Sequence, residues 1–391
     1  MKAPGMIQRL LDALSGGISK LLRRPHVFPL SDRLLADALR LCAIPSPTER
    51  EMERAMFIAE RLGALSLPYT IDEEGNILTR TGAVLGEDIG AEPLLIFTRL
   101  GSERWNPLES LGRLDLEYAR GAGLADVLGP AALLSVVEAY AEGRLAAGRD
   151  IIFFFSALSF DDPESDAFKT VSEGKLRPAA AIGVQGFSLG ALTSHSLGSC
   201  RTEIIVSEDS RPENENALVN TLLQLASQVQ VAAAACAVPV YINRIEALGS
   251  RGHTPREGAL DLELEASDKN MLDAAIERIR AITESFETGS RRNESGGISA
   301  AFSILSSIPP GDPEPSAGLV QTLKALMKEL KIKAAENARP DPSSFLSTLG
   351  IPAISVGIAS GREALNYDKV EIASIEKGRM LLERLISLLG A

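Results

Sequence analysis

The stretch of residues 93–129 constrains the fold of this 391-residue chain more than any other. The apolar run 94–97 predicts a buried strand, and Arg99 stands at the end of that strand. A glycine-rich turn then brings Asp126 to the start of a helix-like run. Strand, glycine turn and helix in this order are typical of open α/β sheets, which form their sites at the carboxyl ends of the strands. A metal site at this strand end would need histidine or carboxylate, whereas the sequence has Phe97 and Arg99.

Strand and helix patterns alternate through most of the chain. The apolar runs 151–157 and 179–184 are typical of parallel strands that are buried on both faces. Thr48 followed by Glu51 is a capping-box pattern for the second helix. We therefore predict an α/β fold with a parallel-rich sheet covered by helices. The predicted helices of this part are residues 31–41, 49–62, 129–141, 316–330 and 371–389, and its other strands are residues 94–98 and 354–357 and the hairpin of residues 69–72 and 76–80.

A different pattern occupies residues 199–310. Its first strand alternates apolar and polar residues, as a strand with one solvent-exposed face does. Its order of strand, helix, strand, strand, helix, strand is typical of a self-contained α+β unit. We therefore predict an α/β domain made of residues 31–198 and 311–391, with residues 199–310 inserted into it. The predicted strands of the insert are residues 201–207, 238–247, 260–266 and 298–306, and its helices are residues 217–231 and 269–286.

Residues 1–30 are predicted to form an amphipathic helix, because apolar residues recur at helical spacing and basic residues gather towards the end. Charged residues such as Arg9 and Asp12 interrupt the apolar positions, so the segment is not a signal-peptide core. Two interpretations stay open. The helix packs on the body of the protein, or it binds a partner or an interface.

Composition argues against several classes of function. The formal net charge of −12 argues against nucleic acid or an anionic membrane as the main partner, since both attract basic surfaces. The three cysteines form no CxxC pair and are typical of reduced thiols in a cytoplasmic protein. Only three histidines are present, which weighs against a histidine-rich metal site. No apolar run is expected to reach the ~18–20 residues of a membrane span.

Four motifs, taken in their order, carry a family resemblance. They are Trp105-Asn106-Pro107, then Arg120-Gly121-Ala122 followed by Asp126, then Gly252-His253-Thr254-Pro255, and last Asp341-Pro342-Ser343 before Gly350-Ile351-Pro352. In this order they resemble the motifs of the zinc-dependent exopeptidases and amidohydrolases of the aminoacylase, peptidase T and succinyl-diaminopimelate desuccinylase type (metallopeptidase family twenty). The resemblance covers residues 31–389. It implies the zinc-exopeptidase, phosphorylase/hydrolase-like α/β fold, a lid formed by the insert, and a homodimer that pairs through this lid.

The resemblance also implies a dinuclear zinc site, in which two histidines and three carboxylates hold the ions and a glutamate acts as general base. Most of the matching positions hold other residues here. One carboxylate cannot hold two divalent cations, so we expect no metal cofactor, and Asp126 is a metal ligand only if a metal is retained. The matching positions are Phe97 and Arg99 at the first histidine motif, Asp126 at the bridging carboxylate, Gln185 at a later carboxylate and Asn366 at the last histidine.

Without zinc, two roles are open for Asp126. One is a buried ion pair with Arg99 in the place of the metal, where the guanidinium would repel a divalent cation. The other is to cap the helix that is predicted to begin at Gly129.

The sequence therefore predicts a metallopeptidase or amidohydrolase homologue with a decayed dinuclear zinc site and no assignable catalytic residue. We expect it to bind a peptide-like or N-acyl amino acid ligand through Arg99, Asp126 and His253, which stands in the lid turn. The alternative is an active hydrolase of peptide or N-acyl bonds with altered metal ligands, drawn from Asp126, the loop 161–164 and His195. A third interpretation is a structural dimer organised by the lid and the N-terminal helix.

Overall fold

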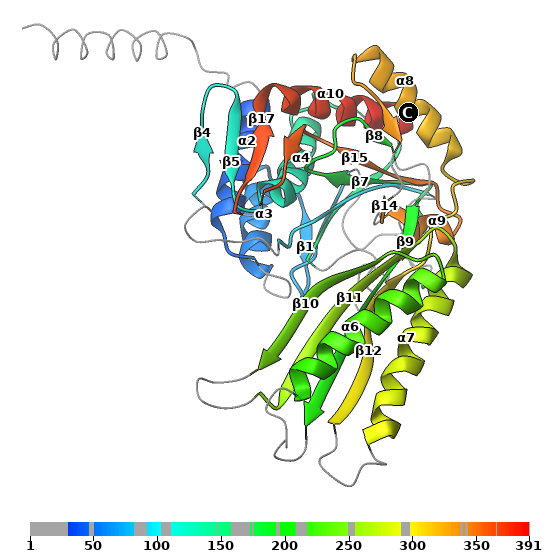
Figure 1. Cartoon of the computed structure of the whole chain (residues 1–391). Helices are drawn as coiled ribbons and strands as arrows, with labels where there is room; N and C mark the ends of the chain where they lie inside the picture. The colour runs from blue at the N-terminus through cyan, green and yellow to red at the C-terminus, as the bar shows by residue number, and fades with distance from the viewer. Residues whose placement is uncertain are drawn as a thin grey trace, which may run out of the picture.

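The computed structural model shows an α/β part that carries an inserted α+β unit (Figure 1). The predicted N-terminal amphipathic helix and the predicted site residues His195 and His253 lie outside the described residues. The structure describes residues 30–46, 51–81, 92–102, 111–146, 148–157, 173, 176–192, 196–208, 217–248, 255–290, 298–336, 339–340, 343–364 and 366–390.

The α/β part is organised around a six-stranded sheet of order β1-β2-β6-β3-β7-β15. Strands β6, β3, β7 and β15 are parallel, so their carboxyl ends meet at one edge. The hairpin of β1 and β2 extends the sheet beyond β6, because β2 pairs with β6 in antiparallel orientation. Every predicted strand of this part is present, and the apolar runs form the buried central strands. The strands are β1 (Tyr69–Ile71), β2 (Ile77–Arg80), β3 (Leu94–Arg99), β6 (Ile151–Ser156), β7 (Ala180–Gln185) and β15 (Ala353–Gly357).

Helices cover both faces of this sheet, because alternate side chains of a strand point to opposite faces. On one face, Ile96 and Phe153 belong to the main apolar cluster, to which α2 (Leu30–Ala43), α3 (Met52–Ala64), α4 (Leu124–Ala141), α8 (Ala317–Glu329) and α10 (Ile372–Leu389) contribute. On the other face, Leu95 and Phe97 pack in a smaller cluster with the short helix α9 (Ser343–Thr348). The predicted α/β class with a parallel-rich sheet is confirmed.

Two predicted helix starts are wrong. Helix α4 begins at Leu124 rather than at Gly129, because Gly123 takes the left-handed conformation (φ 71°) and the Asp368 carboxylate accepts the Ala125 N–H at 3.0 Å. Helix α3 begins at Met52 rather than at residue 49, and the preceding residue makes no side-chain cap hydrogen bond. Thr48 of the predicted capping box lies outside the described residues.

Helix α4 also corrects the expectation that no apolar run reaches the length of a membrane span. Leu124–Ala141 is an 18-residue helix with a mean hydropathy of 1.4, which is long and apolar enough to span a membrane by composition. However, 83% of it is buried inside the fold. Core helices of soluble proteins meet the same criterion, and the neighbours of α4 are the central strands and α2.

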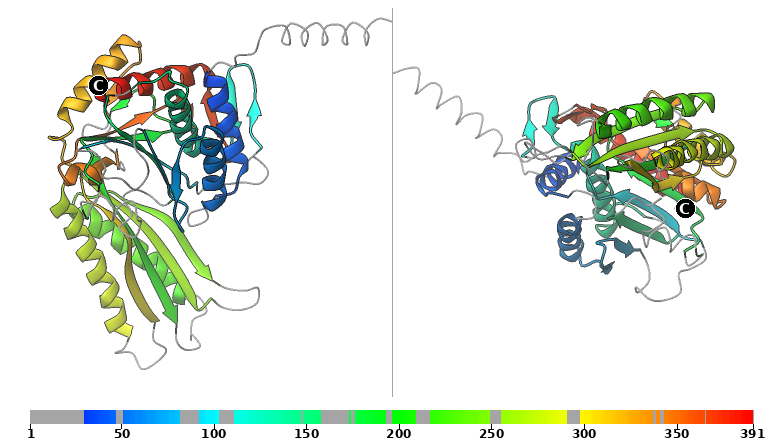
Figure 2. Two further views of the ribbon diagram at one scale, coloured as in Figure 1. Left: turned by 180° about the vertical axis from the view of Figure 1, so that it is seen from behind. Right: turned by 60° about the horizontal axis from the view of Figure 1, so that its bottom comes forward.

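The inserted unit, formed by β9–β12 with α6 and α7, has its own sheet and its own apolar cluster. Its four antiparallel strands have the order β10-β11-β9-β12, and β14 (Arg339–Pro340) pairs with the start of β9. Figures 1 and 2 show it projecting from one end of the α/β part. The predicted order of strands and helices is confirmed, with bounds β9 (Ser196–Glu208), α6 (Ala217–Ala235), β10 (Val240–Leu248), β11 (Glu257–Ala266), α7 (Lys269–Ser290) and β12 (Ile298–Ile308).

Short strands complete the α/β part, and the sequence did not predict them. Because they run for only two to four residues, they carry no alternating pattern. Their pairing matters for the site, since β17 places Asp368 opposite Gly121, just before α4. They are β4 (Arg113–Leu114), β5 (Tyr118–Gly121), β16 (Gly361–Arg362) and β17 (Asp368–Glu371) in one sheet, and β8 (Ala191–Leu192) with β13 (Ala335–Glu336) in another.

Candidate functional site

A cavity of about 230 Å³ lies at the carboxyl ends of β3 and β7. Parallel strands place their sites at this edge of an open sheet, where the first turn of the next helix also arrives. Three of the predicted site residues come together here: Arg99 from β3, Asp126 from α4 and Gln185 from β7. The lining residues are Thr98, Arg99, Gly101, Ala125, Asp126, Val184, Gln185, Gly186, Phe187, Ser188 and Glu363.

Asp126 is positioned by the turn that precedes it. Its Oδ2 accepts a hydrogen bond from Ser102 Oγ at 2.7 Å. A side chain at Gly123 would place Cβ 2.5 Å from the same Ser102 Oγ, and the φ of +71° there also disfavours any other residue. The carboxylate stands in the first turn of α4, where the helix dipole stabilises negative charge. Asp126 is therefore held in the helix rather than capping a helix that starts at Gly129.

The predicted buried ion pair between Arg99 and Asp126 is wrong. Both residues line the cavity, but among the described residues no hydrogen bond or ion pair joins them. Arg99 is exposed rather than buried. A guanidinium and a carboxylate that line one cavity can bind two groups of opposite charge on a polar ligand.

Phe97 and Asn366 do not line this cavity. The Phe97 side chain is 3% exposed and packs beside Phe345 on the opposite face of the sheet. A Cβ at Gly183 of the neighbouring strand would lie 3.1 Å from its ring, so the glycine leaves room for it. Asn366 is exposed. His253, His195 and the loop 161–164 lie outside the described residues, so their predicted roles stay predictions.

Two acidic residues of the site region were missed by sequence reasoning. Glu363 lines the cavity, although it follows a two-residue strand and carries no motif. Asp368 is 1% exposed and binds the N–H of Ala125 at the start of α4. Asp368 stands two residues after Asn366, the position matched to the last histidine. The family resemblance therefore indicated this region, but it did not predict that Asp368 binds the start of α4.

A buried guanidinium binds the residue that follows β3. Arg54 Nη1 donates to the Leu100 carbonyl at 2.6 Å, and its Nε donates to the carbonyls of Leu41 and Ile44. Burial lowers the pKa of Arg54 to about 10. Because one side chain joins α3, the end of α2 and the residue after β3, it holds the wall of the cavity in place.

The donor set of this cavity does not fit a dinuclear zinc centre. Such a centre needs several histidine and carboxylate ligands that converge. Among the described residues, no group of three His, Cys, Asp or Glu side chains comes together in a way that could hold a metal ion. The cavity instead combines Asp126 and Glu363 with the cation of Arg99 and the amide of Gln185.

The six-stranded sheet, the α4 N-terminus at the strand ends and the inserted unit define an α/β fold with an α+β insertion. More particularly, the chain has the fold of the M20 peptidases and amidohydrolases, as the family resemblance of its motifs implied. No protein-family model matches the sequence, and no curated protein matches it.

Three solved structures illustrate this likeness of fold. Human carnosine dipeptidase 1 superposes with a TM-score of 0.73 at 11% identity, covering 92% of this chain and 97% of that one. The aminopeptidase PepT from Bacillus cereus gives 0.63 at 12% identity, covering 92% and 99%. The YXEP protein of Bacillus subtilis, described as a dinuclear metal binding peptidase from the M20 family, gives 0.57 at 15% identity, covering 92% and 98%.

Proposed function

We propose that this chain is a peptidase-fold protein whose strand-end cavity binds a peptide-like or N-acyl amino acid ligand without hydrolysing it. One observation carries the proposal: Arg99 and Gln185 line the cavity together with Asp126. By the family resemblance, Gln185 stands at the position of a carboxylate ligand and Arg99 at that of the carboxylate that supports the first histidine, so the cavity has a cation and an amide in their place.

The lining residues match the groups of such a ligand. A guanidinium binds carboxylates through paired, charge-assisted hydrogen bonds, so Arg99 suits the carboxylate end. The Gln185 amide can both donate to and accept from a peptide or acyl amide. Asp126 and Glu363 accept hydrogen bonds from N–H groups. Ligand pockets usually measure about 300–1,000 Å³, so a cavity of about 230 Å³ is expected to hold one end of the ligand.

The likeness of fold supports this class of ligand. Solved structures that share the fold include a carnosine dipeptidase, an aminopeptidase and a member of the hydantoinase/carbamoylase amidase family. Those activities belong to those proteins, and here they suggest the chemistry of the ligand. Free Cys42, Cys200 and Cys236 support a cytoplasmic location as part of the same proposal.

Calorimetric titration of the full chain with dipeptides and N-acyl amino acids tests the proposal. We expect saturable binding, at least about tenfold weaker after Arg99→Gln because a charge-assisted contact is lost. Arg278→Gln is the matched control, since Arg278 is an exposed arginine on α7. Binding that Arg99→Gln leaves unchanged would contradict the assignment of the cavity.

Metal content and turnover distinguish the proposal from its rival, an active hydrolase with altered metal ligands. The same panel is incubated with the purified chain, and zinc is measured by mass spectrometry. We expect neither stoichiometric zinc nor release of product. Stoichiometric zinc together with turnover that a chelator abolishes would establish the rival and overturn our proposal.

A further inference from the structure

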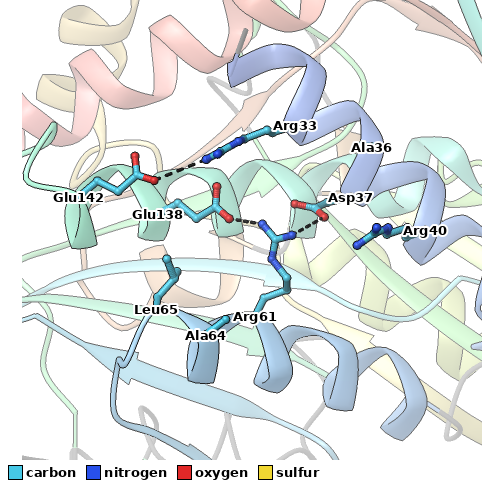
Figure 3. A pocket seen from close by; sticks show the side chains of 9 residues that line it. All are labelled: Arg33, Ala36, Asp37, Arg40, Arg61, Ala64, Leu65, Glu138 and Glu142. Atoms are coloured by element: carbon cyan, nitrogen blue, oxygen red, sulfur yellow. Dashed lines mark hydrogen bonds and ion pairs between the residues drawn. The ribbon is translucent and has the colours of Figure 1, made fainter. Parts of the chain in front are cut away.

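A second cavity, of about 440 Å³, lies between α2, α3 and α4 (Figure 3). It shares no lining residue with the strand-end cavity. Small side chains at Ala36 and Ala64 leave room in it, and Leu65 adds apolar surface. Its volume falls within the range of about 300–1,000 Å³ that small-molecule sites occupy. The lining residues are Arg33, Ala36, Asp37, Arg40, Arg61, Ala64, Leu65, Glu138 and Glu142.

Two buried carboxylates share one guanidinium at the inner end of this cavity. Arg61 Nη1 donates to Asp37 Oδ1 at 3.1 Å, and Arg61 Nη2 donates to the Glu138 carboxylate. The carboxylate side chains are 7% and 6% exposed, so water screens them weakly. Burial raises the pKa of Asp37, the Arg61 guanidinium opposes that rise, Glu138 adds to it, and Arg40 and Arg33 also oppose it. Ionised, the three groups carry a net charge of −1, and Arg40 and Arg33 act on Asp37 from the rim of the cavity.

Each of these carboxylates keeps one oxygen for a further partner. Oδ2 of Asp37 and the second oxygen of Glu138 make no hydrogen bond or ion pair with any described residue. Figure 3 shows both carboxylates beside the open space between the helices. Neither oxygen is among the buried polar atoms that lack a partner, so solvent reaches both, and a donor group on a ligand can do the same. The inner end of the cavity therefore favours a ligand that brings an ammonium group.

The rim of the cavity has the opposite charge. Arg40 stands one helical turn after Asp37 on α2 and forms no ion pair among the described residues. Residues three apart on a helix have Cβ atoms about 5–6 Å apart. Arg33 is already paired with Glu142 at 3.5 Å. Arg40 therefore lies beside Asp37 on the same helix face, and its charge acts on the Asp37 carboxyl.

We propose that this cavity binds a free amino acid, with its ammonium group on Asp37 and Glu138 and its carboxylate on Arg40. The ammonium supplies the cation that the inner end lacks, and the carboxylate supplies the anion that the rim lacks. The remaining space beside Leu65 takes the side chain of the ligand. This site does not depend on the function proposed for the strand-end cavity.

Calorimetric titration of the full chain with alanine, glutamate and lysine tests the proposal, with ethylamine and acetate as probes that each carry one of the two charges. We expect saturable binding of at least one amino acid below about 10 mM, and at least about tenfold weaker binding of both single-charge probes. No saturable binding of any of the three amino acids would overturn the site. Ethylamine binding as tightly as the amino acid would make it a simple cation site and would also overturn the proposal.

Variants then locate the binding. Asp37→Asn and Arg40→Gln should each weaken amino acid binding at least about tenfold. Arg40 is exposed, so its variant stays informative if the buried change at Asp37 impairs folding. Asp32→Asn, an exposed aspartate on the same helix, is the matched control. Binding that survives Arg40→Gln but is lost in Arg99→Gln would belong to the strand-end cavity and would refute the second site.

Discussion

Asp368 is a single buried carboxylate that sets where α4 begins. It is 1% exposed, and its Oδ2 accepts the N–H of Ala125 at 3.0 Å. The first N–H groups of a helix have no partner within the helix, so a carboxylate there satisfies one of them and also interacts with the positive end of the helix dipole. Because α4 carries Asp126, this contact also fixes one wall of the strand-end cavity.

We predict that Asp368→Ala lowers the free energy of unfolding by about 1–3 kcal/mol, because the Ala125 N–H loses its acceptor in a buried setting. Asp368→Asn should cost less, since its amide oxygen can still accept. Urea unfolding measures both. Asp312→Ala, at an exposed turn where Asp312 accepts the Glu314 N–H at 3.0 Å, is the control and should change stability by under about 0.5 kcal/mol. Equal losses at the two positions would contradict the capping role.

The three cysteine thiols are expected to differ in reactivity because they differ in burial. Burial raises the pKa values of Cys42 and Cys200 to about 11 each. A raised pKa keeps the proton on sulfur, and at about pH 8 only some 10⁻³ of each thiol is thiolate, the reactive form. Cys42 also donates its S–H to the Ala122 carbonyl at 2.8 Å. Cys236 is partly exposed.

We therefore predict that iodoacetamide modifies Cys236 first in the native chain near pH 8. Cys42 and Cys200 should react only after unfolding in guanidinium chloride. Mass spectrometry of the peptides reads out the order. Rapid modification of Cys42 in the folded chain would contradict both its burial and its raised pKa.

At the scale of elements, the contact between β7 and α4 depends on a glycine. A Cβ at Gly186 would overlap the carbonyl oxygen of Ala125 in the first turn of α4. The strand end and the helix start can approach this closely only without a side chain. Both residues line the strand-end cavity, so the same approach gives that cavity its shape.

Gly186→Ala is predicted to lower the free energy of unfolding by about 1–3 kcal/mol, because α4 must move away from the sheet. Gly63→Ala is the matched change. A Cβ there meets nothing within 4 Å, and Gly63 lies within α3, so alanine should stabilise by about 0.5–1 kcal/mol. Chemical denaturation of both variants gives the comparison. A tolerated Gly186→Ala would mean that α4 and β7 are not in this close contact.

At the scale of the whole molecule, the chain has separate apolar clusters in the α/β part and in the inserted unit. Strand β10 forms one edge of the inserted sheet. Tyr241 and Ile245 of this strand are 49% and 46% exposed. An exposed edge with apolar side chains is suited to pairing with a second chain. The family resemblance implies a homodimer through this unit, and that remains a proposal for this chain.

Light scattering of the full chain should give about twice the monomer mass of 41.6 kDa. Ile245→Lys should shift the chain to the monomer at the same concentration, since a charge on an edge strand opposes pairing. Val231→Lys on α6, where Val231 is 69% exposed, is the control and should leave the dimer intact. A monomeric wild-type chain would contradict the proposal, and an Ile245→Lys dimer would place the interface elsewhere.

The sequence predicted most of the framework of the fold, and the reason can be seen in particular elements. The apolar runs that form β3, β6 and β7 record that both faces of these strands are buried. The strands of the inserted unit could also be predicted, because apolar and polar residues alternate in them. In β9, for example, Ile204 and Val206 belong to the apolar cluster and Glu203 does not. The candidate site was predicted in part: Arg99, Asp126 and Gln185 line one cavity.

The rest could not be predicted because it depends on partners far apart in the chain. Glu363 reaches the cavity through β16 and β17, which are too short to show a pattern. Phe97 stands at a matched ligand position, yet its side chain packs on the other face of the sheet.

By itself, the sequence determined the longer strands and helices and which of their faces are buried, since hydrophobic periodicity is a local property. Only the tertiary structure decided which charges meet. Asp368 reaches the start of α4 across a separation of 243 residues, and Arg61 joins Asp37 to Glu138 across separations of 24 and 77. Periodicity records that a side chain is buried but not which side chain it meets, so both cavities became visible only in the folded chain.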